Sequence, residues 1–329
     1  MSAAFLDSGS RRRFRKHLLR WYDREKRTLP WRGESDPYRI LVSEIMLQQT
    51  RVVVVKERYQ GFLRQFPSVS RLARASEESV LAAWSGLGYY RRARALRAAA
   101  RHIHDQGAFP GAAAELAQLP GIGRYTAAAV SSIAFGEPVA VVDGNVKRVL
   151  QRLSGEELSL SLSNDAYWQW AQELLEKRRP GDFNQALMEL GATLCLPGQP
   201  VCGRCPVVDF CASRGAGNVR TRNPRKKASL SYLLVQRPGA VLLQQRSASL
   251  SLMPGMWELP SLKRPETKGK IPILKLRHSI TTTDYSILVF SSDGGKKRPK
   301  GAWTPLRSIN RLPLTGLARK ILGRLQLLS

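Results

Sequence analysis

The sequence predicts two domains, a mostly α-helical domain followed by a smaller α+β domain. Its 329 residues are enough for a core in each. Apolar residues recur at helical spacing through residues 10–190, with polar, glycine and proline breaks between the helices. Residues 213–229 are polar, basic and punctuated by glycine and proline, which indicates a linker, and strand-like runs follow it. We therefore place the domains at residues 1–212 and 230–329.

The first informative helix begins at Asp36 and Pro37, where a capping side chain precedes a proline at the first helical position. Glu44 lies on this helix among neighbours that are mostly apolar, because Ile40, Leu41 and Leu47 are three or four positions away. A carboxyl group in such surroundings is costly to ionise, so we expect a raised pKa, as a general acid needs at neutral pH. A half-exposed glutamate at the edge of the apolar stripe is the alternative.

The second element is a turn between two helices at Leu119–Ala127. Pro120 is expected to end one helix, and Gly121 and Gly123 are expected to allow a tight turn with positive φ. An Ala-rich helix follows, so the N–H groups of the turn and the helix dipole point at one spot, which suits a DNA phosphate. An ordinary glycine-capped helix-turn-helix is the alternative. The basic charge and the cysteines downstream favour the phosphate interpretation.

The third element is the run Val139–Lys147, in which an apolar extended segment leads to Asp143 at the start of a helix. Backbone N–H groups and the helix dipole are expected to keep this carboxylate ionised. A simple N-cap is the alternative for Asp143, and both interpretations can hold together. Glu44 and Asp143 thus form a pair with pKa values pushed apart, as in enzymes that cleave bonds to the anomeric carbon of a sugar.

The only cysteines of the chain close the helical domain with the spacing C-x6-C-x2-C-x5-C. Four thiols this close together indicate a metal or cluster site. A zinc site normally uses two short knuckles, and only one is present, so a [4Fe-4S] cluster is favoured and zinc remains the alternative. A disulfide pair does not suit a long basic chain without a secretory signal. The expected ligands are Cys195, Cys202, Cys205 and Cys211.

The second domain contains strand-like and helical segments. Leu230–Gln236 and Val241–Gln245 read as strands joined by a turn at Pro238, and Tyr285–Phe290 reads as another strand. Apolar residues at helical spacing from Leu317 to Leu328 predict a closing amphipathic helix.

The formal net charge of +28 predicts a polyanionic partner, for which nucleic acid is the natural candidate. Residues 211–329 alone hold 23 Lys and Arg against 4 Asp and Glu. No apolar run approaches a membrane span, and the basic N-terminal cluster lacks the apolar region and cleavage site of a secretory signal. We expect a monomeric cytoplasmic protein of the bacterial type, associated with the nucleoid and not with membranes.

These motifs together resemble the helix-hairpin-helix, iron–sulfur DNA glycosylases, and within them the adenine-specific mismatch glycosylases of the MutY type. The resemblance extends from about Trp21 to Cys211. It is carried by the cysteine spacing and by the segments Leu29–Arg32, Ser43–Thr50, Gly86–Tyr90 and Asp143–Leu150. The C-terminal part is similar to that family's second, Nudix-like domain, through Leu242–Arg246 and Gly255–Pro260.

The resemblance implies a helix-hairpin-helix at about 115–135, a [4Fe-4S] loop at 195–211, and excision of adenine opposite 8-oxoguanine or guanine in double-stranded DNA. By this analogy Glu44 protonates the flipped adenine, ionised Asp143 stabilises the oxocarbenium-like sugar, and Tyr125 supports the intermediate. The other implied site residues fall into two groups. The adenine pocket is implied at Trp31, Arg32, Leu47 and Gln185, and DNA contacts are implied at Gln48, Gln49, Thr50, Tyr89, Gly121, Gly123 and Lys147.

The sequence departs from relatives of this family in three places. Endonuclease III-type lyases carry a lysine nucleophile in the hairpin helix, where this chain has Tyr125, so a monofunctional glycosylase is expected. The family reads the lesion with a His-x-Phe-Ser-His loop. Here that stretch is His278–Thr282, in which Thr281 keeps a hydroxyl and Thr282 replaces an imidazole. The second domain has few carboxylates for a metal, so nucleotide hydrolysis is not expected there.

Two other classes remain as alternatives. One is an oxidised-pyrimidine glycosylase and lyase of the endonuclease III type. The other is a non-enzymatic iron–sulfur DNA-binding protein, which would need neither Glu44 nor Asp143.

Overall fold

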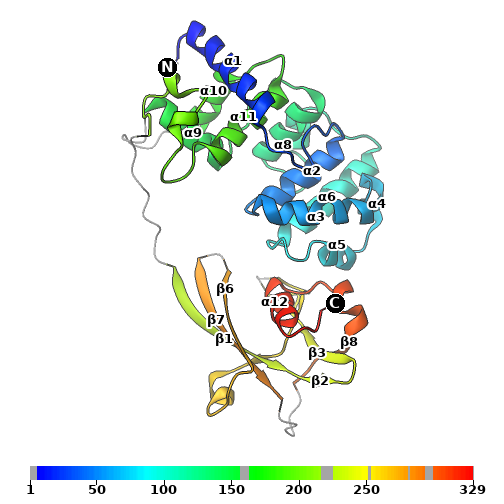
Figure 1. The fold of residues 1–329 in the computed structure, drawn as a ribbon. Helices are drawn as coiled ribbons and strands as arrows, with labels where there is room; N and C mark the ends of the chain where they lie inside the picture. Colours follow the sequence, from blue (N-terminus) through cyan, green and yellow to red (C-terminus); the bar gives the residue numbers. More distant parts are fainter. Residues whose placement is uncertain are drawn as a thin grey trace. The chain divides into compact units, whose positions relative to one another are not determined.

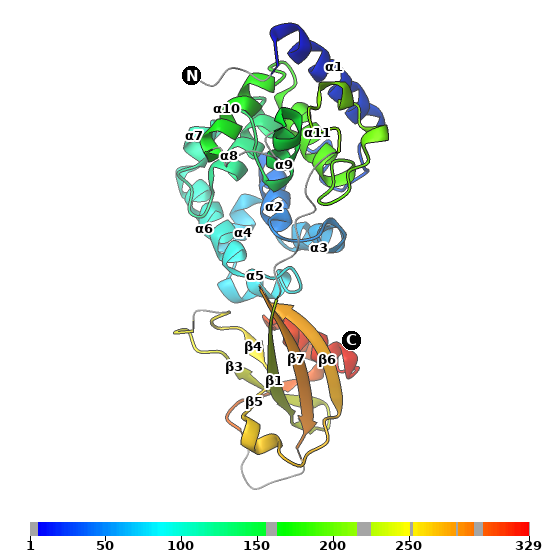
Figure 2. The ribbon, with the colours of Figure 1, turned by 90° about the vertical axis from the view of Figure 1, so that its left-hand side faces the viewer.

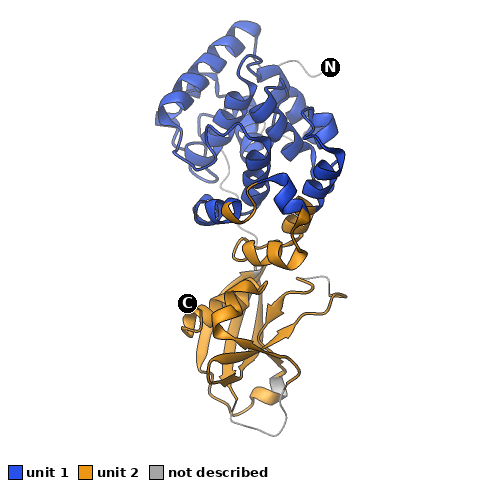
Figure 3. Ribbon diagram, turned by 90° about the vertical axis from the view of Figure 1, so that its right-hand side faces the viewer, with its two compact units in different colours: residues 1–63, 68–73, 98–221 blue, residues 64–67, 74–97, 222–329 orange. Residues whose placement is uncertain are grey.

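The computed structural model describes residues 6–155, 163–215, 225–250, 253–280, 282–292 and 299–328. The chain divides into two compact units, which are coloured separately in Figure 3. Unit 1 contains residues 1–63, 68–73 and 98–221, and unit 2 contains residues 64–67, 74–97 and 222–329.

Unit 1 is helical, as predicted (Figure 1). Its α-helices, whole or in part, are α1 (Ser8–Glu25), α2 (Pro37–Leu47), α3 (Val52–Gln65), α4 (Val69–Arg74), α6 (Arg91–Gln106), α7 (Ala113–Leu116), α8 (Arg124–Val130), α9 (Gly144–Ser154), α10 (Asn164–Leu174) and α11 (Pro180–Thr193). A π-helical turn, η1 (Ser131–Phe135), and two 3-10 turns, η3 (Cys202–Arg204) and η4 (Val208–Phe210), complete it. The predicted start of α2 is confirmed, since Asp36 accepts hydrogen bonds from the first-turn N–H groups and Pro37 is the first helical residue.

Helix α11 organises the core of unit 1, because α1 and α9 both pack against it. Phe14 of α1 is fully buried and contacts Phe183 of α11, with ring centroids 6.4 Å apart. The ring of Phe14 also meets Phe210 of the cysteine loop edge-on, at 5.8 Å. The core therefore joins an early helix, a late helix and the cysteine loop.

The predicted turn at Leu119–Ala127 joins α7 to α8, but in a different form from the one expected. Helix α7 ends at Leu116, before Pro120, and the chain turns through residues 117–122. Gly121 has a positive φ of 74°, as predicted. Gly123 does not, because it is the extended N-cap of α8, with φ −92° and ψ 170°.

Among its described residues, unit 2 contains two small sheets and two α-helices of its own. The helices are α5 (Glu77–Ala83) and α12 (Gly316–Arg324). The strands are β1 (Lys226–Leu234), β2 (Gln236–Arg237), β3 (Ala240–Gln245), β4 (Trp257–Glu258), β5 (Ser261–Leu262), β6 (Leu274–Ile280), β7 (Thr283–Ser291) and β8 (Ala302–Pro305), with 3-10 turns η5 (Arg264–Thr267) and η6 (Leu306–Arg311).

One sheet has the order β5-β1-β7-β6, and the other has the order β2-β3-β4 with β8 paired to β3. Figure 2 shows β1, β7 and β6 side by side; β1 and β7 run parallel, and β6 and β7 antiparallel. Helix α12 closes the apolar core of this unit through Leu317, Ile321 and Leu322. Strand β1 begins at Lys226, inside the predicted linker, because its exposed first residues pair with β7 along the backbone.

The grouping of residues 74–97 with unit 2 differs from a boundary drawn at residue 212. The hydroxyl groups of Ser85 and Tyr90 donate to the carbonyl of Leu314, at 3.4 and 3.1 Å. Arg319 of α12 donates to the Ser85 hydroxyl at 2.7 Å. These buried bonds between distant parts of the sequence explain why the two segments form one unit.

None of the helices in the described residues combines the length and the apolarity needed to cross a lipid bilayer.

Candidate active site

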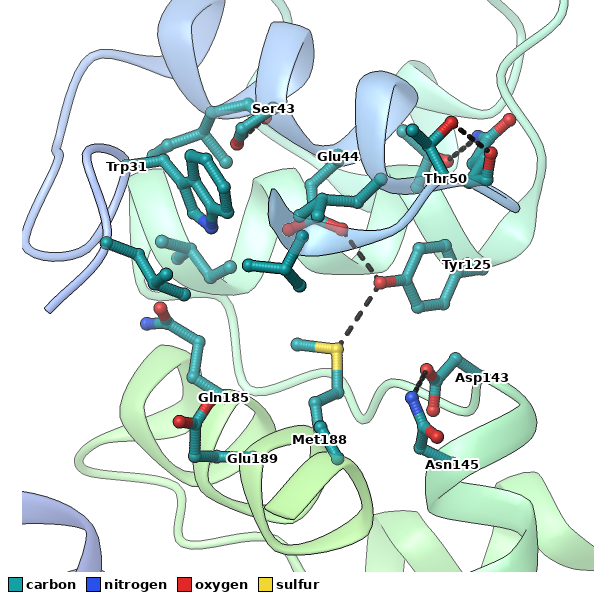
Figure 4. Close-up of a pocket in the computed structure, with 18 of the residues that line it drawn as sticks. Trp31, Ser43, Glu44, Thr50, Tyr125, Asp143, Asn145, Gln185, Met188 and Glu189 are labelled. Atoms are coloured by element: carbon teal, nitrogen blue, oxygen red, sulfur yellow. Dashed lines mark hydrogen bonds between the residues drawn. The ribbon is translucent and has the colours of Figure 1, made fainter. Parts of the chain in front are cut away.

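A cavity of about 840 Å³ in unit 1 collects most of the predicted site residues (Figure 4). It lies between α2, the turn before α8, the start of α9 and one face of α11. All three predicted catalytic side chains and all four predicted adenine-pocket side chains line it. They are Glu44, Tyr125, Asp143, Trp31, Arg32, Leu47 and Gln185.

Glu44 is buried on α2, with 6% of its surface exposed. Its carboxyl accepts a hydrogen bond of 2.8 Å from the hydroxyl of Tyr125. Burial raises the pKa of Glu44, and the charge of Asp143 raises it further; the bond from Tyr125 and the charge of Arg32 oppose the rise. The raised pKa expected from the sequence is confirmed.

Tyr125 stands in the first turn of α8, with its hydroxyl between the Glu44 carboxyl and the sulfur of Met188, 3.3 Å away (Figure 4). Burial raises the pKa of this phenol well above its ordinary value, and the charges of Glu44 and Asp143 add to the effect. The group is therefore a neutral hydrogen-bond donor at physiological pH.

Asp143 is the N-cap of α9, as predicted, and one carboxylate oxygen accepts from the N–H of Val146 at 2.7 Å. The other oxygen accepts from the amide of Asn145 at 2.9 Å. The hydrogen bonds expected to favour its ionised form are present, but the net direction of the pKa shift is upward. Burial raises the pKa of Asp143, and the two hydrogen bonds and Arg148 offset only part of the rise. The sequence could show the cap but not the depth of the cavity around it.

The extended segment that delivers this aspartate is held by side-chain amides. Asn184, buried on α11, donates to the carbonyl of Val139 at 2.9 Å and accepts from the N–H of Val141 at 3.1 Å. Gln172 of α10 accepts from the N–H of Ala140 at 2.8 Å. These amides supply the partners that a neighbouring strand would supply, and so they fix the start of α9.

The opposite wall of the cavity carries an ionic cluster centred on Glu189, which the sequence did not single out. Arg32 donates to Glu189 and to Gln185, each at 2.6 Å, and Arg27 donates to the other oxygen of Glu189 at 2.6 Å. Desolvation of Glu189, which is 1% exposed, would raise its pKa, but the two arginines hold it below the ordinary value. The spacing of four residues between Gln185 and Glu189 was the available signal, since it places both on one face of a helix.

The predicted DNA contacts divide into two groups. Gln48, Gln49, Thr50, Gly121 and Gly123 line the mouth of the same cavity. Within this group the Gln48 amide donates to the Thr126 hydroxyl at 3.0 Å, and Gln49 has a positive φ of 55°.

The other predicted contacts lie elsewhere. Lys147 does not line the cavity; its ammonium donates to Asn164 at 2.9 Å and lies over the ring of Tyr167. Tyr89 belongs to unit 2. Thr281 lies outside the described residues, and Thr282 contributes its backbone carbonyl to the N–H of Lys226 at 3.1 Å.

The four cysteines are partly buried and free of disulfides. Arg152 links two of them, since its guanidinium lies 3.4 Å from the sulfur of Cys195 and its carbonyl 3.3 Å from that of Cys211. Burial raises the pKa of Cys205 to about 11, and the charges of the other three sulfurs contribute. Among the described residues, no three His, Cys, Asp or Glu side chains are grouped to share a single metal ion.

Comparison with known proteins adds independent information. Residues 42–161 match the family described as the HhH-GPD superfamily of base excision DNA repair proteins. Adenine DNA glycosylase of Homo sapiens is 39% identical over 76% of this chain and 57% of its own length. Adenine DNA glycosylase of Mus musculus is 37% identical over 88% of this chain and 73% of its own length. The chain therefore spans little more than half of the human relative.

A solved thermostable thymine-DNA glycosylase has a similar fold. Its structure aligns with a TM-score of 0.58 and 31% identity, over 63% of this chain and 97% of its own.

Proposed function

Because this chain belongs to the adenine DNA glycosylases, we propose that it removes mispaired adenine from DNA by hydrolysing the N-glycosidic bond. The observation that carries the proposal is the buried pair of Glu44 and Tyr125 in one cavity with Asp143. A protein that only bound DNA would have no use for buried ionisable groups facing a cavity, where burial disfavours their charged forms.

Glu44 is proposed as the general acid. Adenine leaves the stack, enters the cavity and becomes a good leaving group once its N7 is protonated. Burial raises the pKa of Glu44 and so favours the protonated form that this role requires. As the bond to the base breaks, that proton stays with adenine and Glu44 becomes a carboxylate, which the Tyr125 hydroxyl stabilises.

Asp143 is proposed to stabilise the positive charge that develops on the deoxyribose. The two hydrogen bonds to its carboxylate favour the ionised form that this role requires, against the effect of burial. Water then attacks the anomeric carbon and gives a proton to the Glu44 carboxylate, which restores the acid. Tyr125 occupies the slot of the lyase lysine, and a phenol cannot form an imine, so the reaction ends at base release.

Adenine selection is proposed to lie on the wall formed by Trp31, Arg32 and Gln185. Arg32 is held by Glu189 and donates to the carbonyl oxygen of Gln185. That bond leaves the amide NH2 of Gln185 to donate to a ring nitrogen of the base. Buried polar groups that are unpaired with a wrong base discriminate against it strongly.

DNA is proposed to be held as a duplex carrying adenine opposite 8-oxoguanine or guanine, by one copy of this chain. The turn at Gly121 presents backbone N–H groups before α8, which suits a phosphate. Gln49 and Tyr89 are proposed to fill the opened stack, and Lys147 to contact the backbone. Thr281 and Thr282 remain the candidates for reading the lesion.

The cysteines are proposed to hold a [4Fe-4S] cluster, which would brace the loop against the core of unit 1. Their four soft sulfur donors, all free and partly buried, fit such a group. A cluster binds each sulfur at a separate iron, so it needs no convergence on one ion, whereas zinc does. Iron and sulfide analysis of the purified protein tests this assignment, and zinc without iron would contradict it.

Single-turnover base release tests the proposed function. Duplexes carrying adenine opposite 8-oxoguanine, guanine or thymine, and one oxidised-pyrimidine duplex, are compared. We expect adenine release opposite 8-oxoguanine and little opposite thymine. Glu44→Gln should abolish release and leave duplex affinity nearly unchanged. Release by this variant would remove Glu44 as the acid, and release of the oxidised pyrimidine alone would indicate the lyase class.

A further inference from the structure

The loop before α6 is strained where it exposes an aromatic side chain. Gly86 and Gly88 have φ values of 96° and 71°, and Tyr89 follows with a φ of 46°. A bulky residue rarely adopts a positive φ, so this conformation needs support from its surroundings. Tyr89 is nevertheless 47% exposed, unlike the buried Tyr90 beside it. The loop therefore holds one large ring at the surface in an unfavourable backbone state.

Arg92 touches both the backbone and the ring of this loop. One guanidinium nitrogen donates to the carbonyls of Leu87 and Gly88, each at 3.0 Å. The guanidinium also lies over the ring of Tyr89, 5.6 Å from its centroid, and over that of Trp84, at 5.5 Å. One planar cation thus fixes the peptide groups before Tyr89 and supports the ring itself.

Trp84 also holds the backbone of this loop. It is fully buried, and its indole N–H donates to the same Gly88 carbonyl at 3.1 Å. Burial lowers the pKa of Arg92 to about 10, so the side chain remains a cation at neutral pH in an environment that disfavours charge. A buried methionine would fill similar space without that penalty, which suggests that the guanidinium serves a purpose beyond packing.

We propose that Arg92 is a positioning residue that holds Tyr89 in the conformation that enters the opened base stack. The inference rests on the proposed function, since it assigns Tyr89 to the DNA. An aromatic wedge is useful only if it is already oriented, because ordering it during binding would consume binding free energy. Arg92 itself need not contact the DNA.

The test uses a double-mutant cycle with a readout that does not depend on base release. Duplex binding is followed by fluorescence of 2-aminopurine placed beside the mispair, which brightens when the stack opens. The variants are Arg92→Met, Tyr89→Ala and the double variant. Arg97→Met is the matched control, because Arg97 lies on the same helix and also loses a carbonyl contact, to Ala75 at 2.7 Å.

We expect Arg92→Met to lower the fluorescence change and the base-release rate by about tenfold, and Arg97→Met to leave both near wild type. Adding Tyr89→Ala to Arg92→Met should have little further effect. Arg92→Lys, which keeps the cation, should restore thermal stability and part of the fluorescence change, and it provides the comparison if Arg92→Met does not fold.

Three results would overturn the inference. If the fold-changes of Arg92→Met and Tyr89→Ala multiply in the double variant, the two residues act independently. An Arg97→Met defect equal to that of Arg92→Met would show a general structural role. If both Arg92→Lys and Arg92→Met gave the wild-type fluorescence change, the side chain at position 92 would have no role in placing Tyr89. Failure of the proposed function would give a different result from failure of this inference. The wild-type protein would then show the fluorescence change without releasing adenine.

Discussion

Glu44, Tyr125 and Asp143 line one cavity, and burial raises the pKa of all three. The charge of Asp143 raises the pKa of Glu44 and of Tyr125 further. Glu44 must be protonated to act as the acid, so activity should be lost as pH rises through its raised pKa. Asp143 must be ionised, so activity should also be lost as pH falls through its pKa. The expected profile is a bell whose two limbs belong to the pair rather than to single residues.

The Tyr125→Phe variant tests how the Tyr125 hydroxyl affects the pKa of Glu44. The hydroxyl donates to Glu44 and so stabilises its ionised form; removing it should raise the pKa of Glu44 further. We expect the basic limb of the single-turnover profile to move to higher pH, and the maximal rate to fall about tenfold. A pH series of base release measures both. An unmoved basic limb would mean that this hydrogen bond does not tune the acid.

At the residue scale, the sequence identified groups whose environment is set by neighbours in the sequence. It missed groups whose environment is set by tertiary contacts. The apolar neighbours of Glu44 predicted its burial correctly. The raised pKa of Asp143 was missed because the surrounding cavity comes from other helices. Glu189 was missed for the same reason, since Arg27 and Arg32 are more than 150 positions away along the chain.

Helix α11 is the element on which the site is built. It supplies Gln185, Met188 and Glu189 to the cavity, and it packs closely on the start of α9. At Gly191 the two helices approach so closely that a Cβ atom would lie 2.7 Å from the Cβ of Asn145. Since Asn145 holds Asp143, this contact links helix packing to the position of the carboxylate.

Gly191→Ala is therefore expected to displace the start of α9. We expect a loss of about 1–3 kcal/mol in the free energy of unfolding, measured by urea titration, with a slower base release. Gly323→Ala is the control, because it lies in α12 and its Cβ would meet only Leu328, at 3.9 Å. That change should be neutral or stabilising. Equal behaviour of the two variants would show that the close approach at Gly191 is not maintained in solution.

Among the elements, the sequence predicted helix and strand types better than their ends. Strands β1, β3 and β7 appear where strand-like runs predicted them, and each begins one to four residues earlier than expected. The extra residues are held by backbone pairing, which leaves no mark on side-chain patterning. The grouping of residues 74–97 with the C-terminal strands could not be predicted, because it depends on hydroxyl-to-carbonyl bonds such as Tyr90 to Leu314.

For the whole molecule, the net charge of +28 should make DNA binding strongly dependent on salt. If six or more phosphates are neutralised, duplex affinity should fall on the order of a thousandfold between roughly 50 and 200 mM salt. Fluorescence anisotropy with a labelled duplex measures this slope. The base-release rate at saturating protein should change little, because saturation removes the salt dependence of binding from the observed rate. An affinity loss below about tenfold would show that the basic surface is not the main source of binding.

The packing of Phe14 against Phe183 and Phe210 also sets an order of events during synthesis. Helix α1 leaves the ribosome before its partners in α11 and the cysteine loop, which are translated more than 150 residues later. At ordinary elongation speeds the apolar side of α1 lacks these packing partners for on the order of ten seconds or longer. The nascent chain is therefore a natural client for chaperones throughout that interval. The core around Phe14 can therefore be completed only after the cysteine loop, with Phe210, has been translated.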